Sequence, residues 1–316
     1  MEKRKLEVYQ KIRVLRGDYL MEINILNNRS CYIPGRVNIG IWKDGEGGCY
    51  LIDSGGDESS GRKLFRLLQE NSLTLKGIIN THSNADHIGG NAYLQKKTSC
   101  VIMASSIERT IIENPVLEPL ILWGAYPFSG IQTKFLQAVP SVVGTELTRG
   151  QVVPNTDLTV IDLPGHFINM IGLLSSDGVC YIADSVFSEE IINKYRFIVT
   201  FDVEATLSTL DKLETIEASW FVPCHAEAIK EDITPIVEVN RKGILSLNDA
   251  VLHSCSDPHS REEVLAHLAA TWNIDMNPVQ YVLNLSTISA HLAFLEKRGL
   301  VETWVEKGFL LWRKKI

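Results

Sequence analysis

Histidine and carboxylate side chains are concentrated in residues 81–90, which read Thr-His-Ser-Asn-Ala-Asp-His-Ile-Gly-Gly. His82, Asn84, Asp86 and His87 all lie within six positions of this stretch. Neutral imidazole nitrogens and carboxylate oxygens are good ligands for zinc and similar divalent cations. The stretch therefore predicts part of a metal site.

The elements around this stretch would hold its ligands rigidly. Residues 77–80 form a short, mainly apolar run that is typical of a strand ending in a loop. Gly89 and Gly90 allow close backbone packing where the next helix begins. We therefore expect a loop that is fixed between a strand and a helix.

Four further potential ligands stand at the ends of predicted strands. They are Asp53 at the end of residues 49–53, His166 after 158–163, Asp184 after 179–183 and His225 after 220–223. Ligands in successive loops can converge on one edge of a pair of sheets. Chance explains one such position easily but explains the whole ordered series poorly.

The ordered series resembles the five motifs of the metallo-β-lactamase superfamily. The matching segments are Leu51-Ile52-Asp53-Ser54-Gly55, Thr81-His82-x-Asn84-x-Asp86-His87, Leu163-Pro164-Gly165-His166, Ala183-Asp184 and Pro223-Cys224-His225. The resemblance spans roughly residues 10–230 and extends to the glyoxalase II-like and β-lactamase-like protein 2 groups. It implies an α+β fold, a four-layer αββα sandwich over residues 1–235, with a dinuclear metal site at its edge.

The resemblance also implies a role for each motif residue. His82 and His166 would bind a first metal, Asp86, His87 and His225 would bind a second, and Asp184 would bridge the two. Asp53 would order the ligand loops by hydrogen bonding. Zinc is the first expectation for one or both ions, and iron and manganese are alternatives.

Asn84 departs from the family pattern, His-x-His-x-Asp-His, in which its position holds a histidine. An amide offers only a carbonyl oxygen, which is a weaker ligand for zinc than imidazole. We therefore expect the second site to fill more tightly and the first to be weak, metal-selective or empty.

The expected activity is hydrolysis of an ester, thioester or amide-like bond in a small molecule. A divalent metal with an open position lowers the pKa of a bound water to about 7. Asp86 or Asp184 would orient that nucleophile and move its proton. Two alternatives stay open: a phosphodiesterase or nuclease of the same superfamily, and a ligand-binding member that has lost turnover because of Asn84.

Residues 236–316 resemble a winged-helix domain. Helices are expected over 260–271, where Ser260 and Glu263 form a capping box, and over 286–297, followed by a hairpin of strands 301–305 and 309–312. The unit holds nine Lys and Arg against nine Asp and Glu. Because phosphate contacts need a basic surface, a cap or homodimerisation role is preferred over DNA binding.

The whole chain has 316 residues and a net charge of −7, so a basic nucleic-acid binder is not expected. Its six cysteines are scattered without a C-x-x-C pair, and no apolar stretch follows the basic N-terminus. A reducing, cytoplasmic setting without a membrane span is therefore expected.

For some residues the sequence leaves two roles open. The aromatic stretch at 120–128 could face a substrate or simply pack on the core. Cys224 could be a ligand or nucleophile, but a small buried residue is preferred. Ser54 and Ser185 are expected to form hydrogen bonds in loops rather than to act as nucleophiles.

Overall fold

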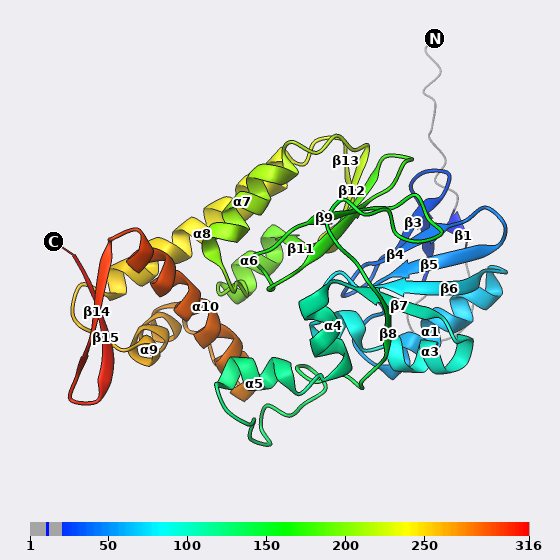
Figure 1. Ribbon diagram of the computed structural model, residues 1–316. Coiled ribbons are helices and arrows are strands. Elements are labelled where there is room, and N and C mark those ends of the chain that lie inside the picture. The colour runs from blue at the N-terminus through cyan, green and yellow to red at the C-terminus, as the bar shows by residue number, and fades with distance from the viewer. Residues whose placement is uncertain (1–10, 13–20, 316) are drawn as a thin grey trace, which may run out of the picture.

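Two β-sheets packed face to face form the centre of the protein (Figure 1). The computed structural model describes residues 11–12 and 21–315. The first sheet has its strands in chain order: β1 (Lys11–Ile12), β2 (Ile23–Ile25), β3 (Ser30–Ile33), β4 (Ile39–Lys43), β5 (Gly48–Ile52), β6 (Thr74–Ile79), β7 (Val101–Ala104) and β8 (Val143–Glu146). Pairing is antiparallel from β1 to β5 and parallel from β5 to β8.

The second sheet has the order β13-β12-β11-β10-β9. Its strands are β9 (Thr159–Asp162), β10 (Ile171–Leu174), β11 (Val179–Phe187), β12 (Trp220–His225) and β13 (Ile229–Lys230). Only β11 and β12 pair in parallel. Parallel pairs, β5 with β6 and β11 with β12, bring the ends of neighbouring strands to one sheet edge.

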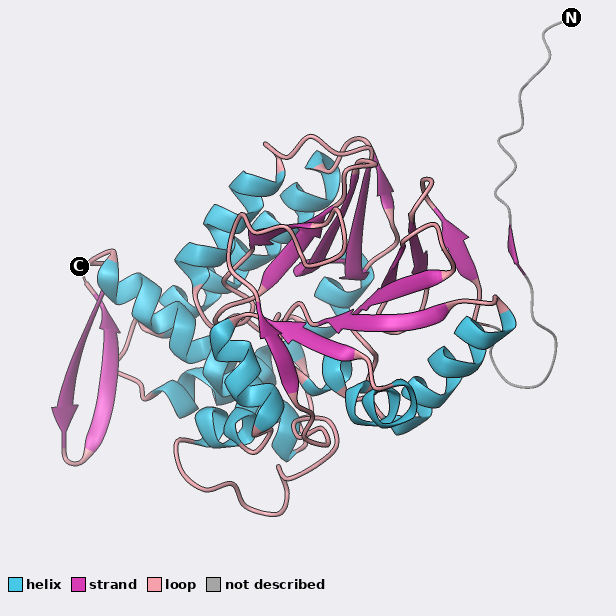
Figure 2. Cartoon of the chain, turned by 45° about the vertical axis from the view of Figure 1, so that its right-hand side comes forward, coloured by secondary structure: helices cyan, strands magenta, loops and turns pink. Residues whose placement is uncertain are grey.

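Helices cover the outer face of each sheet (Figure 2). Helices α1 (Glu58–Glu70) and α3 (Asn91–Thr98) bury Leu64, Leu68 and Leu94 against the first sheet. Helices α6 (Glu189–Tyr195), α7 (Val203–Leu213) and α8 (Thr234–Ser254) lie on the side of the second sheet. The predicted α+β fold with a four-layer αββα arrangement is confirmed.

An apolar core lies between the two sheets and includes the fully buried Tyr181 and the nearly buried Trp42. The Tyr181 hydroxyl donates to the carbonyls of Cys31 and Ile41, so its polar tip is satisfied across the interface. Full burial of a large apolar side chain contributes roughly 1.5–3 kcal/mol. These contacts fix the two sheets, and hence the loops at their common edge.

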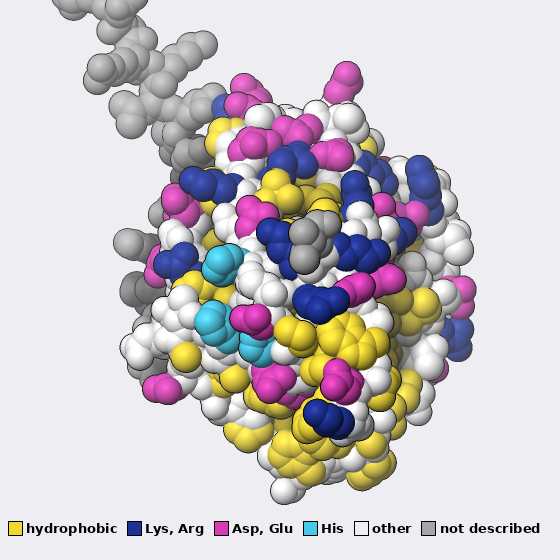
Figure 3. Space-filling model, turned by 90° about the vertical axis from the view of Figure 1, so that its left-hand side faces the viewer, with side chains coloured by type: hydrophobic (Ala, Val, Ile, Leu, Met, Phe, Trp, Pro, Cys, Tyr) yellow, Lys and Arg dark blue, Asp and Glu magenta, His cyan; other side chains and the backbone are white. Residues whose placement is uncertain are grey.

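The C-terminal part consists of helices and a small sheet. It contains α9 (Arg261–Trp272), α10 (Pro278–Lys297) and a hairpin of β14 (Val301–Glu306) and β15 (Phe309–Lys314). The predicted capping box of Ser260 and Glu263 starts α9. Figure 3 looks onto this end of the molecule, where basic side chains are interspersed with acidic and apolar ones. The winged-helix assignment and the boundary after residue 235 stay predictions.

Helix α8 joins the two parts without an interruption. Its first half buries Val237 and Ile244 beside the second sheet, and its second half buries Leu247 and Val251 among the C-terminal helices. The sequence predicts a helix over 233–245, and α8 continues beyond it to Ser254. The proposed boundary falls at the start of a helix that both parts use.

Two further elements run beyond their predicted bounds. Helix α10 begins at Pro278 rather than at residue 286, because proline at the first helical position loses no intrahelical hydrogen bond. Asn277 and Gln280 cap this start reciprocally. Strand β11 continues through Asp184 to Phe187, so Asp184 lies inside a strand, next to a break in the pairing register with β12.

The remaining predictions about the chain have mixed outcomes. The sequence also predicts one or two strands within residues 6–28. This prediction falls partly outside the described residues, and only β1 and β2 can be compared with it. All six cysteines are buried and free. Within the described part of the chain, no helix is both long and apolar enough to cross a membrane.

Candidate metal centre

The segment that runs from the end of β6 through α2 (Ala85–Ile88) carries four of the predicted site residues. Asn84 stands immediately before α2, and Asp86 and His87 lie within it. A Cβ atom at Gly89 would lie 2.2 Å from the carbonyl carbon of Gly56, so only glycine permits this approach. The expectation of close backbone packing after the ligand loop is confirmed.

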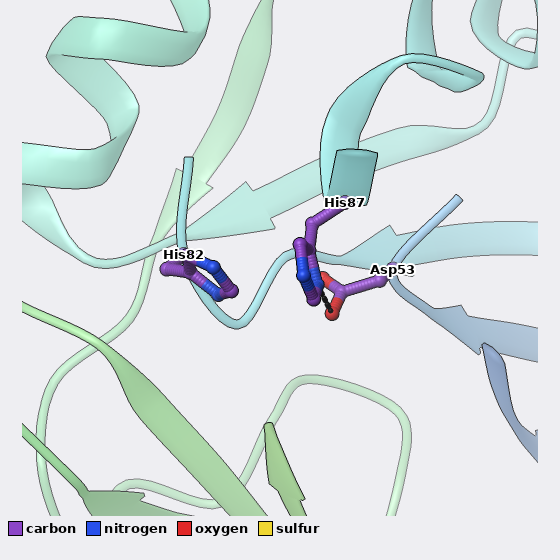
Figure 4. A group of neighbouring side chains, drawn as sticks. All are labelled: Asp53, His82 and His87. Atoms are coloured by element: carbon purple, nitrogen blue, oxygen red, sulfur yellow. Dashed lines mark hydrogen bonds and ion pairs between the residues drawn. The ribbon is translucent and has the colours of Figure 1, made fainter. Parts of the chain in front are cut away.

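Asp53 fixes this loop from the neighbouring strand β5. Its carboxylate accepts hydrogen bonds from the Thr81 backbone N–H at 2.9 Å and the Thr81 hydroxyl at 2.8 Å. It also lies 2.9 Å from Nδ1 of His87. Figure 4 shows the His87 ring between Asp53 and His82. Asp53 adopts a φ of 66°, a strained value that occurs often at functional sites.

The hydrogen bonds of His87 and His82 determine which ring nitrogen carries the proton. The Nδ1 atom of His87 faces the Asp53 carboxylate, which can only accept. The Nδ1 atom of His82 lies 3.0 Å from the Thr81 hydroxyl, whose own proton is donated to Asp53. Both rings therefore donate from Nδ1 and present an unprotonated Nε2 when they are neutral.

His166 and His225 are fixed in the same way by backbone carbonyls. The Nδ1 atom of His166 donates to the carbonyl of Val199 at 2.8 Å, and that of His225 donates to the carbonyl of Arg36 at 2.9 Å. All four imidazoles thus use Nδ1 for structural hydrogen bonds and leave Nε2 available. Such outer partners are a regular feature of histidine metal ligands.

The Nε2 atoms converge on Asp184. Its Oδ2 atom lies 3.1 Å from Nε2 of His225 and 3.5 Å from Nε2 of His166, and its Oδ1 atom lies 3.4 Å from Nε2 of His87. Asp86 approaches from the solvent side, at 3.8 Å from His87 and 3.6 Å from His225. Asp184 is thus the one carboxylate shared by the whole cluster.

Two sets of potential ligands with a suitable spacing follow from this convergence. The ligand atoms of each set lie within 4.8 Å of one another, and the sets are His82, His166 and Asp184, and Asp86, His87 and His225. The Nε2 atoms of His82 and His87 and Oδ1 of Asp184 are buried without a hydrogen-bond partner. Because burying unpaired polar atoms is costly, these atoms fit a site that holds cations.

Charges in the cluster shift the proton affinities of its members. Burial raises the pKa of Asp184, but the neighbouring His225 and His87 lower it well below its usual range. Burial lowers the pKa of His87, but Asp184, Asp86 and Asp53 together raise it well above the ordinary value. Burial holds the pKa of His82 well below its usual range. Asp184 is therefore ionised and available as a bridging ligand.

Asn84 occupies the edge of the first set. Its Oδ1 atom lies 3.1 Å from Nε2 of His166. Burial lowers the pKa of His166, which favours the neutral ring. Because Nδ1 donates to the carbonyl of Val199, Nε2 of the neutral ring is an acceptor that faces another acceptor. Two acceptor atoms at this distance repel unless a cation lies between them. The amide is thus brought to the first set of ligands, as the motif position implied.

Two buried glutamates complete the site and were not predicted. Glu108 from α4 (Ser106–Glu113) accepts from the backbone N–H and hydroxyl of Ser83 and from the N–H of Asn169. Glu118 from α5 (Leu117–Trp123) accepts from the Asn84 amide at 2.7 Å. Burial raises the pKa of Glu108 to about 7 and that of Glu118 well above its usual range.

The structure decides between some of the alternative roles that the sequence left open. Ser54 donates to the side chain of Asn91 within the loop framework, as expected. The same expectation is wrong for Ser185, which lies inside β11 and whose buried hydroxyl has no hydrogen-bond partner. Cys224 is buried, and burial raises the pKa of its thiol, which disfavours a nucleophile. Its sulfur can join His87 and Asp184 in a third ligand set, so a ligand role stays open. Residues 117–123 form helix α5, and a substrate-facing role for this stretch stays a prediction.

Residues 32–225 match the family model described as the metallo-beta-lactamase superfamily. The match covers more than half of the chain and includes every predicted ligand. The chain therefore belongs to the metallo-beta-lactamase superfamily.

Curated relatives add the class of reaction. A hydroxyacylglutathione hydrolase from Haemophilus ducreyi is 26% identical over 194 residues, which cover 61% of this chain and 68% of that protein. One from Prochlorococcus marinus is 23% identical over 171 residues, which cover 54% of this chain and 58% of that protein. The chain is a hydrolase of this superfamily.

Solved structures share the fold over most of the chain. A beta-lactamase domain protein from Burkholderia ambifaria is 16% identical, with a TM-score of 0.70, and the match covers 93% of this chain and 94% of that one. A metallo-beta-lactamase family protein from Thermus thermophilus is 18% identical, with a TM-score of 0.67, and the match covers 88% of this chain and 94% of that one. The similarity in fold extends past residue 225 into the C-terminal helices.

Proposed function

We propose that the chain hydrolyses an acyl ester or thioester of a small molecule at a centre of two divalent cations. The observation that carries the proposal is the convergence on Asp184 of the Nε2 atoms of four imidazoles, each of which uses Nδ1 for a structural hydrogen bond. His82 and His166 would hold one cation, Asp86, His87 and His225 the other, and Asp184 would contact both. Imidazole and carboxylate donors suit zinc, and they also accept iron or manganese.

The bound cations would lower the pKa of a water molecule and polarise the oxygen of the scissile bond. The two carboxylates of the site differ in what they can add to this chemistry. The Asp184 side chain is only 3% exposed and is surrounded by histidines. Its role would therefore be to hold the cations in position between these imidazoles. The Asp86 side chain is 51% exposed and can accept a proton and release it to solvent.

The relatives favour a thioester among the possible substrates. The similar hydrolases are named for hydroxyacylglutathione, so an acylated thiol is the first substrate class to test. A phosphodiester is the second. Residues 1–235 hold 22 basic against 29 acidic side chains, which disfavours a nucleic-acid backbone.

A substrate panel with metal analysis tests the proposal. Purified protein would be assayed against a hydroxyacyl thioester of glutathione, a lactone and bis-(p-nitrophenyl) phosphate, with Asp184→Asn as the matched inactive variant. We expect thioester or lactone hydrolysis that a chelator abolishes and added metal restores. Turnover of the phosphodiester alone would establish the nuclease alternative. Bound metal without turnover of any substrate would favour a ligand-binding protein instead.

A further inference from the structure

The amide of Asn84 is held from behind by a buried carboxyl group. Its Nδ2 atom donates to Oε1 of Glu118 at 2.7 Å, and its Oδ1 atom lies 3.1 Å from Nε2 of His166. Glu118 is only 3% exposed, which is rare for a glutamate. Asn84 is therefore clamped between an acceptor on one side and the first set of ligands on the other.

This clamp determines which end of the amide faces the site. A side-chain amide has a donor end and an acceptor end, and only the acceptor end can bind a cation. The Oε1 atom of Glu118 is the acceptor that faces the donor end of the amide. With Nδ2 bound to Glu118, the Oδ1 atom must point towards His166. The reverse orientation would turn an N–H group towards the cation and repel it.

The helix that carries Glu118 rests on the C-terminal part of the protein. The segment after α5 buries Ile131 and Leu136 against Val282 of α10, and Leu122 of α5 packs on the same cluster. The early start of α10 at Pro278 supplies the turn that holds Val282. The C-terminal helices thus support the position of Glu118 through direct apolar contacts.

We propose that Glu118 is a positioning residue that makes Oδ1 of Asn84 a ligand of the first metal, with α10 holding Glu118 in place. The first site then has two imidazole nitrogens and two oxygens, from Asn84 and Asp184, and is occupied although it binds less tightly than the second. The proposal rests on the metal centre of the proposed function but not on the bond that the centre hydrolyses.

A double-mutant cycle measured by metal binding tests this role. Zn²⁺ and Mn²⁺ would each be titrated against a competing chelator for the wild type, Glu118→Gln, Asn84→Ala and the double variant. Anomalous scattering from crystals would assign each affinity to a position. Glutamine can accept from or donate to Asn84, so it no longer selects one amide orientation. The matched control is Glu113→Gln, which removes a charge from α4 without contacting the site.

We expect Glu118→Gln to raise the dissociation constant of the first site by about 10-fold or more and to leave the second unchanged. The effect should vanish when Asn84 is already alanine. An equal effect in both backgrounds, or none in the wild-type background, would overturn the role of Glu118. If Glu118→Gln does not fold, Glu118→Asp, which keeps the charge and shortens its reach, should give the same first-site loss. A wild-type protein that binds no metal would instead reject the metal centre itself.

Discussion

His87 and Asp53 form a fully buried pair in which Nδ1 of the imidazole lies 2.9 Å from Oδ2 of the carboxylate. The same carboxylate also accepts two hydrogen bonds from Thr81. In Asp53→Asn the amide keeps one acceptor atom for three donors. We expect the dissociation constant of the second metal to rise about 10–100-fold, as measured by chelator competition.

The control for this variant is Asp211→Asn. It removes a carboxylate whose side chain is 69% exposed, pairs with Arg241 and belongs to none of the ligand sets. Metal affinity should not change in this control. An Asp53→Asn protein that binds both metals like the wild type would show that Asp53 has no part in orienting His87.

Asp184→Asn should weaken both metals at once, because Asp184 approaches the imidazoles of both ligand sets. An amide supplies one neutral oxygen in place of a bridging carboxylate. Elemental analysis should fall from two metals to one or fewer per chain, and hydrolysis should fall by more than about 100-fold. Loss of only the second metal would remove Asp184 from the first site.

Asp86→Asn should separate turnover from metal retention. Asp86 belongs to the second ligand set alone and reaches solvent. We expect hydrolysis to fall about 10²–10⁴-fold, the range for loss of a proton-transfer group, while the first metal is kept. Steady-state kinetics and metal content would be measured on the same sample. Full turnover in this variant would assign proton transfer to another group.

His291 makes the C-terminal helices sensitive to acid. Burial lowers its pKa from 6.5 to about 4, and its ring contacts Asn248. The unfolded chain therefore takes up a proton at a higher pH than the folded one. The stability that the neutral, buried His291 contributes is thus present above pH 6.5 and is lost as the pH falls towards 4. The loss amounts to about 3 kcal/mol in the free energy of unfolding.

Urea unfolding above pH 6.5 and again between pH 4 and 6.5 would measure this dependence. His291→Gln has no titrating group, so its stability should fall less with acid than that of the wild type. Parallel pH profiles for the two proteins would show that His291 is not the group responsible.

Val282→Ala tests the mechanical link between the C-terminal helices and the metal site. The side chain is buried against Ile131 and Leu136, and its truncation should cost roughly 2 kcal/mol of stability. If α10 supports α5, affinity at the first metal should also fall while the second metal is unaffected. Val251→Ala, a similarly buried substitution within the C-terminal core, should lower stability without changing metal affinity.

Much of the site could be predicted from the sequence because its residues differ sharply from their surroundings. His82, His166 and His225 each follow an apolar strand, and a polar ligand after a strand is visible without coordinates. The resemblance of these motifs to the metallo-β-lactamase superfamily likewise implies the layers. Asp184 can be identified for the same reason, although its strand runs further than its apolar pattern indicates.

Glu108 and Glu118 could not be found in this way. Each is an acidic residue near the start of a short helix, a position that glutamate commonly occupies at the surface. Only the packing of α4 and α5 beside the ligand loop buries them. The long reach of α10 also depended on a proline and a capping pair rather than on apolar spacing.

Helix α8 is shared by the two parts of the protein. Its first half lies over the second sheet and its second half lies within the C-terminal core, and the helix is continuous between them. A displacement of the C-terminal helices would therefore be transmitted along α8 to β11, the strand that carries Asp184. A change that moves the C-terminal helices should therefore also change the position of this ligand.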